Sequence, residues 1–65
     1  MKYSEKLLQF RAEHNLTQAQ LAELFDVAVL TITRYEKGVS KPTAMKQLQF
    51  EKKMREKELE EKENV

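Results

Sequence analysis

Residues 16–38, LTQAQLAELFDVAVLTITRYEKG, decide the fold of this chain. Thr17 is followed three residues later by Gln20, a capping-box spacing in which each side chain satisfies a free backbone N–H at the start of a helix. Leu16, just before this cap, is placed to pack on the helix as a hydrophobic staple. The apolar residues that follow at helical spacing are Leu21, Ala22, Leu24 and Phe25. The pattern predicts a short amphipathic helix that ends at Asp26.

The second half of the stretch, residues 28–38, predicts another short helix. Gly38 suits the left-handed conformation in which many helices end. Ile32 and Tyr35 are three residues apart, and we expect them to face the core together with Val27. The residues expected on the other, exposed side are Leu30, Thr33, Arg34 and Lys37. This helix therefore presents a mixed apolar and basic face to its surroundings.

A further helix is expected before this pair, over residues 4–13. Ser4 is placed to be its N-cap, and Leu7 and Phe10 share one face because they are three residues apart. Asn15 can adopt the left-handed conformation that ends a helix. The chain would then turn directly into the capped helix that follows.

A fourth helix is expected after a loop over residues 39–42. Pro42 favours the loop because it lacks an N–H and restricts the residue before it. Thr43 is placed to cap the fourth helix. The residues of its first part that are expected to continue the core are Ala44, Met45, Leu48 and Phe50.

Charged residues dominate this helix after residue 50, where only Met54 and Leu59 interrupt them. The opposite charges four residues apart, worth about 0.2–0.5 kcal/mol a pair on an exposed helix, are Glu51–Arg55 and Glu58–Lys62. We expect a solvated helix, with a self-association helix as the alternative. A regular coiled coil is not expected, because the apolar residues keep no heptad. The predicted organisation is a domain over residues 1–50 and a charged helical extension over residues 51–65.

Composition limits the classes of protein to consider. The chain has 65 residues, of which 35% are charged and 40% hydrophobic, with one Gly and one Pro, as in a small helical domain. It has no Cys and one His, so we expect no disulfide and no metal site of the Cys/His type. No apolar run opens the chain, and a cytoplasmic protein without membrane contact is expected. The net charge of +1 means that any electrostatic footprint must come from local placement.

These features together resemble the phage repressor and Cro type (XRE-like) of helix-turn-helix domain. The matching residues are Arg11, Leu16, Thr17, Gln18, Leu21, Ala22, Val27, Ile32, Glu36, Gly38 and Pro42. The resemblance implies an all-α fold, a small helix-turn-helix domain of four helices. The fourth helix is long and charged, and the family's usual fifth helix is absent. Two other residues depart from the family: Asp26 stands where it usually has Gly, and Ala28 where it usually has a Ser or Thr cap.

The resemblance also implies roles for individual residues. Arg11 and Glu36 would form an ion pair that ties the first helix to the end of the third, the alternative being two unpaired surface charges. The residues expected to contact DNA phosphates are Gln18, Lys37, Ser40 and Lys41, the alternative being ordinary surface roles. The residues expected to face DNA bases are Ala28, Val29, Leu30, Thr33 and Arg34. Of these, Val29 and Leu30 could contact thymine methyl groups, pack within the protein or contact another protein.

Two functions of different classes follow. The first is a sequence-specific DNA-binding transcriptional regulator, a repressor that inserts its third helix into the major groove of double-stranded DNA. The resemblance implies a homodimer on a palindromic operator. The alternative is a protein-interaction module, an antagonist of another regulator, that uses Val29 and Leu30 as an apolar patch. An enzyme is not expected, because His14 is placed in a solvated loop and no base–nucleophile arrangement is evident; no cofactor or small-molecule ligand is implied.

Overall fold

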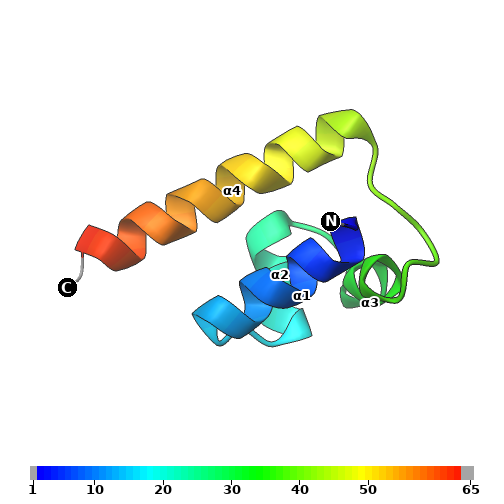
Figure 1. Cartoon of the computed structure of the whole chain (residues 1–65), viewed down its shortest axis with the longest axis horizontal. Helices are drawn as coiled ribbons and strands as arrows, with labels where there is room; N and C mark the ends of the chain where they lie inside the picture. Colours follow the sequence, from blue (N-terminus) through cyan, green and yellow to red (C-terminus); the bar gives the residue numbers. More distant parts are fainter. Residues whose placement is uncertain (1, 64–65) are drawn as a thin grey trace.

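The computed structural model describes residues 2–63 and contains four helices connected by short segments (Figure 1). Their bounds are α1 (Tyr3–His14), α2 (Gln18–Phe25), α3 (Val29–Lys37) and α4 (Ala44–Glu63). The three shorter helices form a cluster, and α4 lies along one side of it. The all-α fold of four helices, with a long and charged last helix, is confirmed. Within the described residues, no helix has the length and apolar character to span a membrane.

Each of the three short helices ends on a residue in the left-handed conformation. These are Asn15 with φ 55°, Asp26 with φ 58° and Gly38 with φ 77°. The capping box of α2 is present, since Gln20 N donates to Thr17 Oγ1 at 3.1 Å and Thr17 N donates to Gln20 Oε1 at 2.8 Å. In the turn between α2 and α3, Asp26 adopts a left-handed conformation that Gly would adopt with less strain.

The start of α1 differs from the prediction, whereas the starts of the later helices agree with it. The prediction that Ser4 caps α1 is wrong, because α1 begins at Tyr3 and its N-cap is Lys2, which makes no side-chain capping bond. Ala28 caps α3 and likewise provides no side-chain bond. The prediction for Thr43 is confirmed, since its hydroxyl accepts a hydrogen bond from Lys46 N at 3.3 Å.

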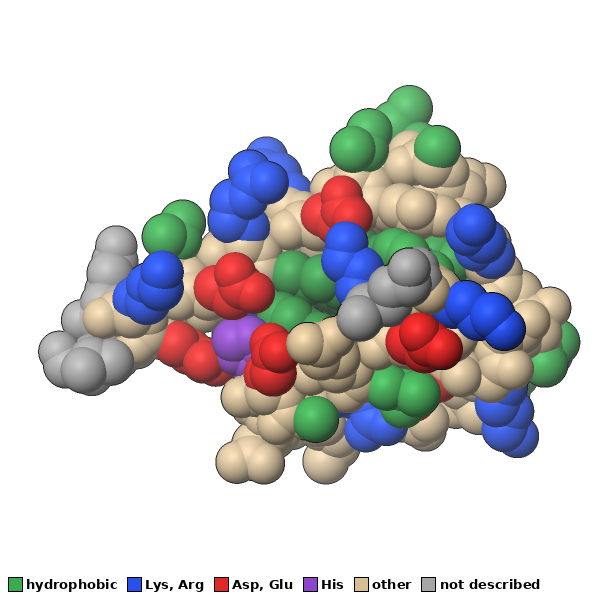
Figure 2. Space-filling view, in the orientation of Figure 1, with side chains coloured by type: hydrophobic (Ala, Val, Ile, Leu, Met, Phe, Trp, Pro, Cys, Tyr) green, Lys and Arg blue, Asp and Glu red, His purple; other side chains and the backbone are tan. Residues whose placement is uncertain are grey.

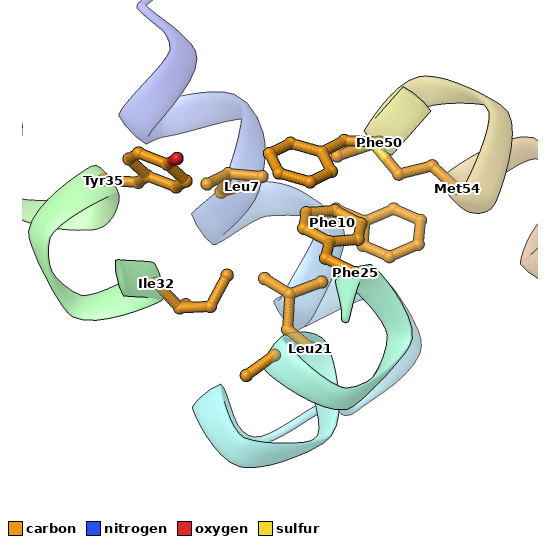
Figure 3. Close-up of a cluster of buried hydrophobic side chains, with 9 residues drawn as sticks. Leu7, Phe10, Leu21, Phe25, Ile32, Tyr35, Phe50 and Met54 are labelled. Carbon is orange, nitrogen blue, oxygen red and sulfur yellow. The ribbon is translucent and has the colours of Figure 1, made fainter. Parts of the chain in front are cut away.

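All four helices contribute to one hydrophobic core (Figure 3). Its fully buried side chains are Leu7 from α1, Leu21 from α2 and Ile32 from α3. α4 closes the core with Phe50 and Met54, and the ring of Phe50 stacks on that of Phe25 at a centroid distance of 4.3 Å. The remaining buried hydrophobic residues are Phe10, Ala22 and Tyr35.

The face that α4 turns to the core matches the prediction only in part, because Phe50 is buried as expected but Ala44 is exposed. Met45 and Leu48 were expected in the core, but each is 67% exposed. Phe50 and Met54, four residues apart, form the buried face. At 3.6 residues per turn, Met45 and Leu48 lie on the opposite side of the helix from these two. The core therefore extends past residue 50, into the segment expected to be a solvated extension.

Contacts with α1 also hold α4 in place. Glu51 pairs with Lys6 rather than with Arg55, four residues along its own helix. The expected pair Glu58–Lys62 is not among the ion pairs of the described residues, where Lys57–Glu61 at 3.9 Å is the one with this spacing. Glu61 Oε2 also lies 2.7 Å from Nδ1 of the last residue of α1, His14.

The environment of His14 also differs from the prediction. It does not lie in a solvated loop, because it is the last residue of α1 and its side chain is 9% exposed. Its ring lies 4.4 Å from the ring of Phe10, between centroids. The histidine thus joins the covered contact between α1 and α4.

Candidate nucleic-acid interface

The anchor of the site is an ion pair between α1 and α3. Arg11 Nε donates to Glu36 Oε2 at 2.7 Å, and Arg11 Nη2 donates to Glu36 Oε1 at 2.9 Å. This two-bond geometry matches the planar guanidinium to the carboxylate. The Glu36 side chain is 5% exposed and that of Arg11 is 23% exposed, so water screens the pair only in part. The pair fixes the end of α3 against α1, as the resemblance implied.

Gln18 extends this polar contact to the start of α2. Its Nε2 donates to Glu36 Oε1 at 2.9 Å, and its Oε1 accepts from the Thr33 hydroxyl at 3.1 Å. The Thr33 hydroxyl also lies 3.2 Å from the carbonyl oxygen of Val29, one turn earlier in α3. The four side chains of Arg11, Glu36, Gln18 and Thr33, here called the polar chain, therefore connect three helices.

The outer face of α3 carries most of the other residues that are predicted to contact DNA. Leu30, Arg34 and Lys37 are exposed and lie at i, i+4 and i+7, along one side of the helix. Val29 is 44% exposed and Leu30 57% exposed, which leaves both apolar side chains open to a partner. On the opposite side, Ile32 and Tyr35 are buried in the core. Ala28, at the start of the helix, is also exposed.

The loop after α3 follows a path set by the end of that helix. The carbonyl oxygen of Arg34 accepts from Val39 N at 3.0 Å and lies 3.4 Å from Ser40 N. Ser40 and Lys41 are exposed, as a role in holding phosphate requires. Lys37 lies just before this loop and is exposed as well.

Lys2 is a further candidate for contact with DNA that sequence patterns did not predict. With Ser40 and Lys41 it lines a hollow of about 190 Å³ between the start of α1 and the loop after α3. The chain separates Lys2 from Lys41 by most of the domain, so no local pattern could have joined them. The basic residues of α3 itself are Arg34 and Lys37. The two lysines at the hollow add positive charge beside them.

Tyr3 lines the same hollow and has an unusual environment. Its hydroxyl is buried and has no hydrogen-bond partner among the described residues. Burial, with smaller contributions from nearby Glu51 and Tyr35, raises the pKa of Tyr3 to about 12. The hydroxyl is therefore neutral at physiological pH and makes no ionic contribution to the site. Among residues 2–63, no cluster of three or more His, Cys, Asp or Glu is arranged to hold a metal ion.

Comparison with known proteins identifies the family. A family model described as helix-turn-helix matches residues 7–61, which is most of the chain. The comparisons with curated proteins and with solved structures give no match. The chain belongs to the phage repressor and Cro-type (XRE-like) helix-turn-helix family, whose members are DNA-binding transcription regulators. The matched range runs from the first core residue of α1 almost to the end of α4.

Proposed function

We propose that this protein is a sequence-specific transcriptional repressor that inserts α3 into the major groove of double-stranded DNA. The observation that carries the proposal is the division of α3 into two faces. Ile32 and Tyr35 fix one face in the core, and Leu30, Arg34 and Lys37 leave the other exposed. A helix held rigidly in this way can be presented to a groove that admits one α-helix.

The proposed base-facing residues are Ala28, Val29, Leu30, Thr33 and Arg34. Arg34 makes no ion pair with any described residue, so its guanidinium is available for the O6/N7 edge of guanine. Val29 and Leu30 have the chemistry to contact thymine methyl groups. The proposed phosphate contacts are Gln18 at the start of α2, Lys37 at the end of α3, and Ser40 and Lys41 in the loop that follows α3.

Selection from a random library of DNA duplexes, followed by fluorescence anisotropy titration, tests this function. Arg34→Ala should lose about 1–3 kcal/mol on the selected site and relax the preference at one base pair. Lys41→Ala should weaken all sequences alike and reduce the salt slope by about one. Lys62→Ala, a charge change near the C-terminal end of α4, serves as the control. A wild-type protein that binds no duplex at low salt would rule out the proposal.

We further propose that the protein binds a palindromic operator as a homodimer. Two copies related by a twofold axis would place their α3 helices in successive major grooves, about 34 Å apart. Sedimentation equilibrium with and without the selected duplex measures the stoichiometry. One protein per non-palindromic site would contradict the dimer but leave DNA binding intact.

A protein-interaction module is the second candidate, and the exposure of Val29 and Leu30 favours it. In that case the two side chains would bury themselves against another regulator and would not face DNA. Substitution of both by Lys should then abolish binding to the partner protein. For a DNA reader, the same double substitution should instead change base preference, so the selected sequences distinguish the two functions.

A further inference from the structure

Thr33 differs from the other proposed base-facing residues because its hydroxyl already has partners in the protein. Its single hydroxyl hydrogen can be donated to Gln18 Oε1 at 3.1 Å or to the Val29 carbonyl oxygen at 3.2 Å. The residue is also only partly exposed, whereas Arg34, next to it in sequence, is exposed. Thr33 therefore lies on the side of α3 that faces the start of α2.

The chemistry of the polar chain fixes the orientation of the Gln18 amide. The Glu36 carboxylate can only accept hydrogen bonds, so the NH₂ group of Gln18 must face it. The amide oxygen then points to Thr33, which is able to donate to it. Nε2 carries a second hydrogen, for which residues 2–63 provide no acceptor. Gln18 is thus held at two atoms with one donor left over, at the first residue of α2.

We infer that Thr33 is a positioning residue: it acts on DNA through Gln18 and does not read a base. This inference rests on the proposed function, and it changes the role of one residue within it. Thr33 and Glu36 hold the Gln18 amide so that its second hydrogen points to a phosphate oxygen beside the N-terminus of α2, where free backbone N–H groups also favour an anion. Base recognition then falls to Ala28, Val29, Leu30 and Arg34.

A double-substitution cycle on DNA binding tests this inference. Thr33→Val keeps the β-branched shape of the side chain and removes the hydroxyl. It should weaken binding to the selected site and to unrelated duplexes equally, about three- to tenfold, the effect of losing one neutral hydrogen bond. In a Gln18→Ala background, Thr33→Val should have no further effect. Thr33→Ser should retain wild-type affinity, and Thr31→Val serves as the matched control for the same change elsewhere on α3.

A measurement on the free protein separates positioning from general loss of structure. NMR relaxation of the Gln18 side-chain NH₂ should show increased motion in Thr33→Val and unchanged motion in Thr31→Val, with both variants fully folded at the temperature of the measurement. The inference is overturned if Thr33→Val changes preference at one base pair, if its effect persists without Gln18, or if the Gln18 amide stays equally ordered. A wild-type protein that binds no duplex would overturn the proposed function and this inference together.

Discussion

Glu36 is the residue on which the most contacts of the site converge. Its side chain, 5% exposed, accepts bonds from Arg11 and from Gln18. A covered carboxylate with this many donors is stable only while the donors remain, because an uncompensated charge away from water is costly. The pair thus makes the position of α3 depend on α1, the helix that precedes the helix-turn-helix pair α2 and α3.

Arg11→Met should therefore destabilise the protein by about 3 kcal/mol, since it leaves the Glu36 charge without its main partner. That loss is a large fraction of the stability of so small a domain. Adding Glu36→Gln to Arg11→Met should recover much of it, because an amide carries no charge and still accepts from Gln18. Urea unfolding of the wild type and the two variants measures the differences. Equal stability of Arg11→Met and wild type would mean that the pair contributes nothing.

Substitution of Tyr3 should stabilise the protein, in contrast to substitution of Arg11. Its hydroxyl is buried without a partner in the described residues, so Tyr3→Phe should raise stability at neutral pH by up to about 1 kcal/mol. The raised pKa, about 12 against 10 for the unfolded chain, adds a pH dependence. Folding favours the neutral phenol, so this stability is complete below pH 10 and is lost as the pH rises towards 12. Between pH 8 and 12, the melting temperature should therefore fall more steeply with pH for wild type than for Tyr3→Phe.

At the scale of the helices, α3 begins without a side-chain cap. Ala28 has the extended backbone of an N-cap, φ −70° and ψ 149°, but no oxygen to accept from the first turn. Ala28→Ser should supply that oxygen and stabilise the protein by about 0.5–1 kcal/mol, or several degrees in melting temperature. Ala12→Ser, an exposed change within α1, should be slightly destabilising because Ser is a poorer helix former than Ala. The same sign for both variants would contradict the capping argument.

Local sequence patterns predict most of the helices and their ends. The capping box at Thr17 and Gln20, and the left-handed residues Asn15 and Gly38, are decided by neighbours within a few residues. The face of α4 is different, because its sequence contains two apolar pairs at helical spacing. Which pair turns inward depends on the path of the preceding loop and on the position of Phe25, neither of which is a local property.

The candidate site divides in the same way. Exposure of Leu30 and Arg34 follows from the helical period once Ile32 is assigned to the core. The hydrogen bonds of Gln18 to Glu36 and Thr33 cannot be predicted from the helical period. They join residues fifteen or more positions apart, through contacts between helices. The position of Lys2 beside Lys41 could not be predicted for the same reason, since the two residues are far apart in the chain.

At the scale of the whole molecule, α4 has two apolar faces with different surroundings. One carries Phe50 and Met54 into the core. The other carries Met45, Leu48 and Leu59, and Figure 2 shows hydrophobic side chains standing out along the upper edge of the molecule, over α4. Because the helix is apolar on opposite sides, its sequence has no single stripe, and its second half resembles a solvated extension when the residues are read in order.

Substitutions on the two faces of α4 decide whether its second half belongs to the domain. Met54 is 6% exposed and Leu59 is 53% exposed, although they are close in sequence on one helix. Met54→Ser should cost about 2–4 kcal/mol, because it removes a core side chain and leaves a hydroxyl in its place. Leu59→Ser, the matched control, should stay within about 0.5 kcal/mol of wild type in the monomer. Urea unfolding at low protein concentration compares them. Equal, small effects would make residues 51–65 a separate extension, and a large effect of Met54→Ser alone would extend the folding unit through the middle of α4.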